Sequence, residues 1–227
     1  MIYNEKKFLK VLEKSFEMYK LHGAISPEKL KPIHKFIANT LENIFGNLYK
    51  IYYMSEDTKE MTIDGKYYPK DIDITIVKNE IPVFCLGIKF VTSNFKQNAN
   101  NYFENMMGET ANIQAVGNLP YAQIIILRHE TPYYKKNETK IPSKIEVITD
   151  KYIQKYLNLL FDNPQAHRPY FMGIQFININ EKTGKILTTN LDKLFSEEIA
   201  NLLKTKLSLS YFFEEISSCK DYLSTKK

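Results

Sequence analysis

Two neighbouring stretches decide the fold, DIDITIV at residues 71–77 and PVFCLGIKFV at residues 82–91. Both alternate in a period of two, which is typical of β-strands whose successive side chains point to opposite faces of a sheet. The alternation assigns one face to the core (Ile72, Ile74, Ile76, Phe84, Leu86, Ile88 and Phe90) and the other to Asp71, Asp73, Thr75, Gly87 and Lys89. The short link at residues 78–80 favours a tight hairpin. We therefore expect Asp73 and Lys89 on one side of adjacent strands.

Lys89 is unusual because it interrupts an apolar strand. A buried ammonium is costly unless it meets an acid or takes part in chemistry. Metal-dependent phosphodiester hydrolysis suits such a pair: an aspartate holds a divalent cation against the phosphate, and a lysine can orient or deprotonate the attacking water. A second carboxylate completes the metal shell, because Mg²⁺ prefers hard oxygen ligands.

The order of these residues resembles the PD-(D/E)xK nuclease superfamily, and its type II restriction endonucleases in particular. Residues 69–73 (PKDID) match the first motif element and residues 87–89 (GIK) the second, within a resemblance that covers about residues 69–113. The resemblance implies a restriction-endonuclease-like α/β fold, with a central mixed β-sheet flanked by helices. It also implies a Mg²⁺-dependent homodimer of a restriction-modification system that cuts double-stranded DNA at a specific short site. Asp73 would bind Mg²⁺, with Asp71 as the fallback, and Lys89 would serve the water.

Position 87 departs from the family pattern, since Gly87 stands where the family carries a carboxylate. Three explanations are open: the carboxylate has moved elsewhere, the protein is a catalytically inactive DNA-binding relative, or the position was altered to inactivate it. Some restriction enzymes supply this glutamate from the following helix. Glu104 has the spacing that this variant implies, and Glu109 is its rival, nearer the edge of the helix's apolar face.

A polar stretch follows the lysine. Amide side chains can pair with adenine, while lysine and serine suit phosphates, and the start of the following helix favours an anion. The alternative is a solvated loop whose asparagines cap a helix. The candidate DNA contacts are Ser93, Asn94, Lys96, Gln97, Asn98, Asn100 and Asn101.

The remaining pattern predicts a single nuclease domain over residues 1–227, with a catalytic core at about 48–130 and a C-terminal elaboration at about 145–227. Apolar periodicity and turn residues predict the elements. The expected helices are 4–20, one beginning at Ser26-Pro27, 97–116, 150–161 and one or two within 192–217; the expected strands, besides the two above, are 48–54, short segments around an Asp64-Gly65 turn, 122–127, 144–148, 170–178 and 185–189.

Composition sets limits. The formal charge of +5 admits a polyanionic partner without requiring one. No apolar run is long enough to span a bilayer, the charged start does not resemble a signal peptide, and the two cysteines match no zinc or redox spacing. We expect a cytoplasmic protein in which Cys85 is a buried small hydrophobe. A repair or recombination nuclease of the same superfamily, specific for DNA structure, remains an alternative.

Overall fold

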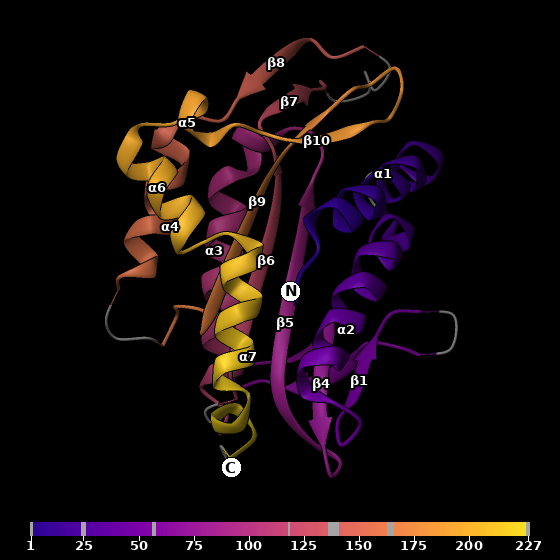
Figure 1. Cartoon of the computed structure of the whole chain (residues 1–227), viewed down its shortest axis with the longest axis vertical. Coiled ribbons are helices and arrows are strands. Elements are labelled where there is room, and N and C mark those ends of the chain that lie inside the picture. Colours follow the sequence, from indigo (N-terminus) through magenta and orange to yellow (C-terminus); the bar gives the residue numbers. More distant parts are fainter. Residues whose placement is uncertain are drawn as a thin grey trace.

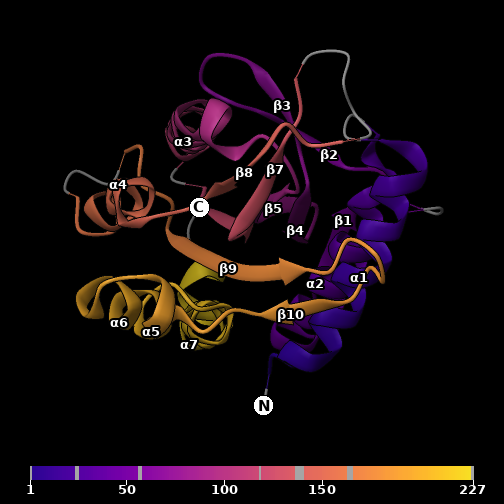
Figure 2. The same ribbon diagram turned by 90° about the horizontal axis from the view of Figure 1, so that it is seen from above.

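The computed structural model describes residues 2–23, 26–55, 58–117, 119–135, 141–162 and 166–225. Within them a curled mixed sheet has the strand order β1-β4-β5-β6-β9-β10 (Figures 1 and 2). The strands are β1 (Lys50–Tyr53), β4 (Ile74–Lys78), β5 (Ile81–Val91), β6 (Tyr121–Arg128), β9 (Phe171–Ile179) and β10 (Ile186–Thr188). Strand β6 runs parallel to β5 and β9, and the other pairs are antiparallel. The predicted central mixed sheet is confirmed.

Helices cover both faces of this sheet. The first face packs on α1 (Glu5–His22), α2 (Lys31–Phe45) and α7 (Leu209–Thr225). The second packs on α3 (Phe95–Gln114), α4 (Asp150–Leu160) and the region of α5 (Leu191–Leu194) and α6 (Glu197–Thr205). In Figure 2, α1 and α2 lie at one side of the curled sheet and α3 and α4 at the other. In the part of the chain that the structure describes, no helix is long and apolar enough to cross a membrane.

The hairpin of β4 and β5 forms as the sequence predicts. Asn79 and Glu80 form its two-residue turn with φ values of 50° and 63°, and positive φ at both positions matches the twist of the flanking strands. The alternating apolar residues of β5 enter the core, including Phe84 and Ile88. Gly87 and Lys89 consequently face α3.

The prediction of one continuous strand over residues 71–77 was wrong. The chain leaves the main sheet at Asp73, and the preceding residues form β3 (Pro69–Ile72), which pairs only with β2 (Met61–Asp64) in a separate two-stranded sheet. Ile72 therefore joins a small cluster with Ile63 and Ile113, not the core occupied by Ile74. This break places Asp73 at the junction of the two sheets.

Other boundaries differ in detail. Ser26 caps only a 3₁₀ turn, η1 (Pro27–Lys29), and the following α-helix begins at Lys31. The turn after Asp64 is a four-residue loop at 65–68, since Asp64 pairs with Pro69. The predicted strand at 144–148 is β8 (Lys144–Val147), and its partner β7 (Glu130–Tyr133) was not predicted.

Cys85 lies fully buried on β5, as predicted. Burial raises the pKa of its thiol to about 12, so almost no reactive thiolate forms at neutral pH. In a Cys219→Ser variant, where Cys85 is the remaining cysteine, we expect negligible reaction with a chromogenic disulfide reagent at pH 8 and full reaction in denaturant. Equal rates in native and denatured protein would contradict this burial.

Candidate functional site

The carboxylate of Asp73 replaces a missing strand partner. Pairing between β4 and β5 begins at Ile74 and Leu86, so among the described residues no strand pairs with the next residues of β5 on that side. The backbone N–H of Ile88 donates instead to Asp73 Oδ2 at 2.6 Å. An aspartate side chain can take over a backbone hydrogen bond in this way, and the bond fixes Asp73 beside the residue that precedes Lys89.

Glu109 is the carboxylate that the structure brings to Lys89. It lies in α3, which crosses the face of β5 that carries Gly87 and Lys89. Its Oε1 is 3.9 Å from the ammonium of Lys89 and 3.0 Å from that of Lys70. Its Oε2 accepts a hydrogen bond of 3.0 Å from the hydroxyl of Tyr121. The side chain of Glu109 is 12% exposed and that of each lysine about a third, so Glu109 is largely buried while both lysines remain partly open to solvent.

Lys70 reaches Glu109 because of its place in the β2–β3 hairpin. Alternate residues of β3 share a face, so Lys70 lies on the face of Ile72, which packs against α3. Asp71 lies on the opposite, exposed face, where its carboxylate accepts a hydrogen bond from its cross-strand partner Thr62. The structure therefore does not bring Asp71 to Glu109, and Lys70, which sequence reasoning missed, takes a place in the site.

The hairpin is held on α3 by Asn112, a fully buried amide. Its Oδ1 accepts from the backbone N–H groups of Tyr67 and Tyr68, and its Nδ2 donates to the carbonyl of Tyr68. Gly65 makes room for this contact, because a Cβ there would lie 2.1 Å from Asn112 Nδ2. A satisfied buried amide fixes geometry more strictly than apolar packing does, so the position of Lys70 is built into the fold.

The charges at the site act on one another. Burial, followed by the nearby charges of Asp73 and Asp71, raises the pKa of Glu60 above its usual value. Burial tends to lower the pKa of Lys70, but the charge and hydrogen bond of Glu109, with a contribution from Asp73, outweigh it and the pKa is raised. Asp73 and Glu109 are thus both close enough to Lys70 to stabilise a cation there.

His34, from α2, lies near the carboxylate of Asp73. Its side chain is 1% exposed, and its Nε2 is 3.9 Å from Asp73 Oδ1. Within the described residues neither ring nitrogen has a hydrogen-bond partner. Burial lowers the pKa of His34, against the opposing effect of Asp73, so the imidazole is neutral at physiological pH.

Glu104 is not part of this group. It is exposed on α3, and its charge acts on Lys155 of α4. Five positions separate it from Glu109, which turns the two side chains well apart around a helix of 3.6 residues per turn. The structure therefore favours Glu109 over Glu104 as the carboxylate beside Lys89.

Much of the predicted DNA-contacting stretch is engaged within the protein. The amide of Asn94 exchanges two hydrogen bonds with the backbone of Tyr134. Asn98 donates to the carbonyl of Asn94, and Asn100 accepts from Lys155. Ser93 is half-buried just before α3, whereas Lys96, Gln97 and Asn101 are exposed on its first turns. These internal bonds favour a structural role for most of the asparagines.

The site fits a hard divalent cation in its donor chemistry. Asp73 and Glu109 supply carboxylate oxygens, and the charges of both act on Lys70, whose ammonium is 3.0 Å from Glu109 Oε1. No group of three or more acidic, histidine or cysteine side chains is arranged as a ligand set among the described residues. A Mg²⁺ ion here would keep several ligands from water and substrate, as it commonly does.

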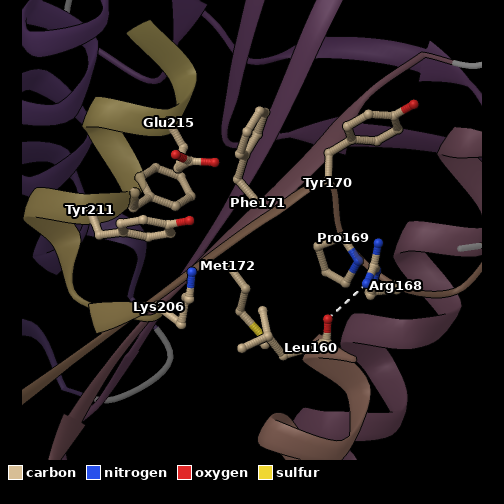
Figure 3. A pocket seen from close by; sticks show the side chains of 10 residues that line it. Leu160, Arg168, Pro169, Tyr170, Phe171, Met172, Lys206, Tyr211 and Glu215 are labelled. Atoms are coloured by element: carbon tan, nitrogen blue, oxygen red, sulfur yellow. Dashed lines mark hydrogen bonds between the residues drawn. The ribbon is translucent and has the colours of Figure 1, made fainter. Parts of the chain in front are cut away.

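A separate pocket lies where the start of β9 meets α4 and α7 (Figure 3). Its volume is about 150 Å³, and its lining includes Tyr170, Lys206 and Tyr211. Arg168 at its rim donates to the carbonyl of Leu160 at 2.7 Å. The lining includes none of the residues that were predicted from the sequence as functional, so this pocket is distinct from the site around Asp73 and Glu109.

Comparison with protein-family models, curated proteins and solved structures finds no match to this chain.

The raised pKa of Glu60 predicts a pH-dependent effect on stability. Protonation of this carboxyl favours the folded state below its unfolded pKa, and that contribution is lost as pH rises through the folded pKa. We expect Glu60→Gln to raise the melting temperature at pH 8 in EDTA, with a smaller gain at pH 4. Glu17→Gln, at an exposed position on α1, is the control and should change little. A Glu60→Gln gain independent of pH would contradict the electrostatic account.

Proposed function

We propose that this protein is a Mg²⁺-dependent endonuclease of the type II restriction kind, acting on double-stranded DNA with Asp73, Glu109 and Lys89 at its active centre. The observation that carries the proposal is the contact between Lys89 and Glu109 beside the anchored Asp73. These residues come from a strand end, a neighbouring strand and the next helix, in the order that the resemblance to PD-(D/E)xK nucleases implies. Glu109 supplies the carboxylate that Gly87 lacks.

Asp73 and Glu109 would hold Mg²⁺, which when bound lowers the pKa of a coordinated water and stabilises charge on the phosphate. Asp73 is restrained for this role by the N–H of Ile88. The ammonium of Lys89 lies where it can orient the attacking water and balance the developing negative charge. Lys70, released from Glu109 by the cation, would be free to contact a phosphate oxygen of the substrate.

The β2–β3 hairpin supports a polymeric substrate. Tyr67 and Tyr68, in its loop, are 71% and 47% exposed, and Lys66 lies over the ring of Tyr67 at 5.5 Å. Exposed tyrosines next to a lysine suit contacts with sugars, bases and phosphates. The loop adjoins the site, since Tyr68 also acts electrostatically on Lys70. For a palindromic DNA site, a homodimer would match the two-fold symmetry of the substrate.

Plasmid digestion with Mg²⁺ tests the proposed activity. We expect discrete fragments from the parent protein, because a restriction endonuclease cuts at a defined site. Lys89→Ala, Asp73→Asn and Glu109→Gln should each lower the cleavage rate by about a hundredfold or more, since each removes a group at the reacting centre.

Glu104→Gln is the matched control, because it makes the same change on the same helix away from Lys89. It should cut like the parent. Loss of cleavage in Glu104→Gln but not in Glu109→Gln would reject the assignment of the carboxylate. Cleavage without discrete fragments would favour a structure-specific nuclease, and DNA binding without cleavage at enzyme excess would favour an inactive relative.

A second prediction concerns the contact between the β2–β3 hairpin loop and DNA. In a Lys89→Ala background, which prevents cleavage, Tyr67→Ala should weaken binding of fluorescently labelled DNA about fivefold or more, because stacking on an aromatic ring contributes about 1–3 kcal/mol per base. Tyr222→Ala, at another exposed tyrosine (56%), should bind like its background. Equal affinities for the two variants would remove the hairpin loop from the DNA interface.

A further inference from the structure

Gly87 is required for space and not for backbone conformation. It is absent from the glycines with positive φ among the described residues. A Cβ built at residue 87 would lie 2.2 Å from the hydroxyl oxygen of Tyr121 and 2.8 Å from Oε1 of Gln123. Both distances are below any normal contact, and a packed interior does not absorb such an overlap without displacing a side chain. The hydroxyl of Tyr121 therefore occupies the volume that a side chain at position 87 needs.

Tyr121 is held rigidly in this position. It is the first residue of β6, its side chain is 1% exposed, and its strand pairs with β5 in register at Cys85. Its backbone carbonyl accepts from the N–H of Tyr170 at 2.7 Å, and its own N–H donates to Gln114 Oε1. These backbone contacts fix the position of the hydroxyl beside β5.

From that place the hydroxyl orients Glu109. It donates to Glu109 Oε2 at 3.0 Å, and a carboxylate is a stronger acceptor than the amide oxygen of Gln123 at 3.3 Å. Burial, then the charges of Glu109 and Asp73, raises the pKa of Tyr121 well above its usual value, so the hydroxyl stays a donor. With Oε2 held by Tyr121, Oε1 is turned toward Lys70 and Lys89.

We propose that Gly87 and Tyr121 form a matched pair, in which the missing side chain at residue 87 admits the tyrosine hydroxyl that positions Glu109 for metal binding. Tyr121 is a positioning residue that acts through Glu109. This inference rests on the proposed function, and it explains how a glutamate from α3 can replace a carboxylate on β5. It also predicts that restoring the family residue with Gly87→Glu damages the site and does not improve it.

The packing half of the pair is tested by thermal unfolding, which needs no enzymatic activity. Gly87→Ala should lower the melting temperature by a few degrees in the parent, because the new Cβ overlaps the hydroxyl. In a Tyr121→Phe background the same change should lower it less, since the nearest atom is then Gln123 Oε1 at 2.8 Å. Equal losses in the two backgrounds would overturn the pairing.

The positioning role of Tyr121 is tested by two values: the dissociation constant for Mg²⁺ alone, measured by calorimetry, and the Mg²⁺ concentration that half-saturates plasmid cleavage. Tyr121→Phe should raise both values about tenfold or more, as expected when a residue that supports a metal ligand is removed. Glu109→Gln should raise them further, and the double variant should resemble Glu109→Gln because Tyr121 acts only through Glu109.

Tyr156→Phe is the control, because its hydroxyl is buried without a hydrogen-bond partner in the described structure. Mg²⁺ values for Tyr121→Phe equal to those for Tyr156→Phe would overturn the positioning role. A parent that neither binds Mg²⁺ nor cuts DNA would reject the proposed function and the positioning role with it, while the unfolding cycle would still decide whether residues 87 and 121 are matched.

Discussion

The hydrogen bond from the N–H of Ile88 to the carboxylate of Asp73 is the constraint on which the site depends. It ends the pairing of β4 with β5 without leaving a buried donor unsatisfied, which would otherwise destabilise the fold by about 1–3 kcal/mol. It lets the chain leave the sheet and form the β2–β3 hairpin, which delivers Lys70. The side chain of Asp73 therefore ends the pairing of two strands and is itself held in place, while Asn112 holds the hairpin that carries Lys70 on α3.

The charged side chains around the site fall into two groups. Three acidic residues influence one another in the first group: Glu60, Asp71 and Asp73. In the second group, the positive charges of Lys70 and Lys89 offset the negative charge of Glu109. Of the two lysines, Lys70 lies closer to Glu109: its Nζ is 3.0 Å from Glu109 Oε1, against 3.9 Å for Nζ of Lys89. In the proposed function, Asp73 and Glu109 would hold the divalent ion, and Lys70 would contact the substrate instead of Glu109.

The sequence predicted the sheet and most helices because their apolar periodicity survives in the packed structure. It could not predict the break at Asp73, because the isoleucines on either side continue the same alternation. Which glutamate lies beside Lys89 depends on the rotation of α3 about its own axis, and the sequence does not give that rotation. The position of Glu109 near the apolar face of the helix was nevertheless a usable signal. Lys70 could have been found from strand alternation once β3 was separated from β4. Tyr121 had no sequence signal, since its role comes from a contact across two parallel strands with a residue that has no side chain.

Diffraction from crystals soaked in Mn²⁺, with anomalous data to locate the ion, tests the central claim most directly. The account predicts Mn²⁺ bound by the carboxylates of Asp73 and Glu109, with the ammonium of Lys70 moved away from Glu109 and Tyr121 still donating to it. Mn²⁺ bound elsewhere, or an unchanged contact between Lys70 and Glu109 at saturating Mn²⁺, would contradict it.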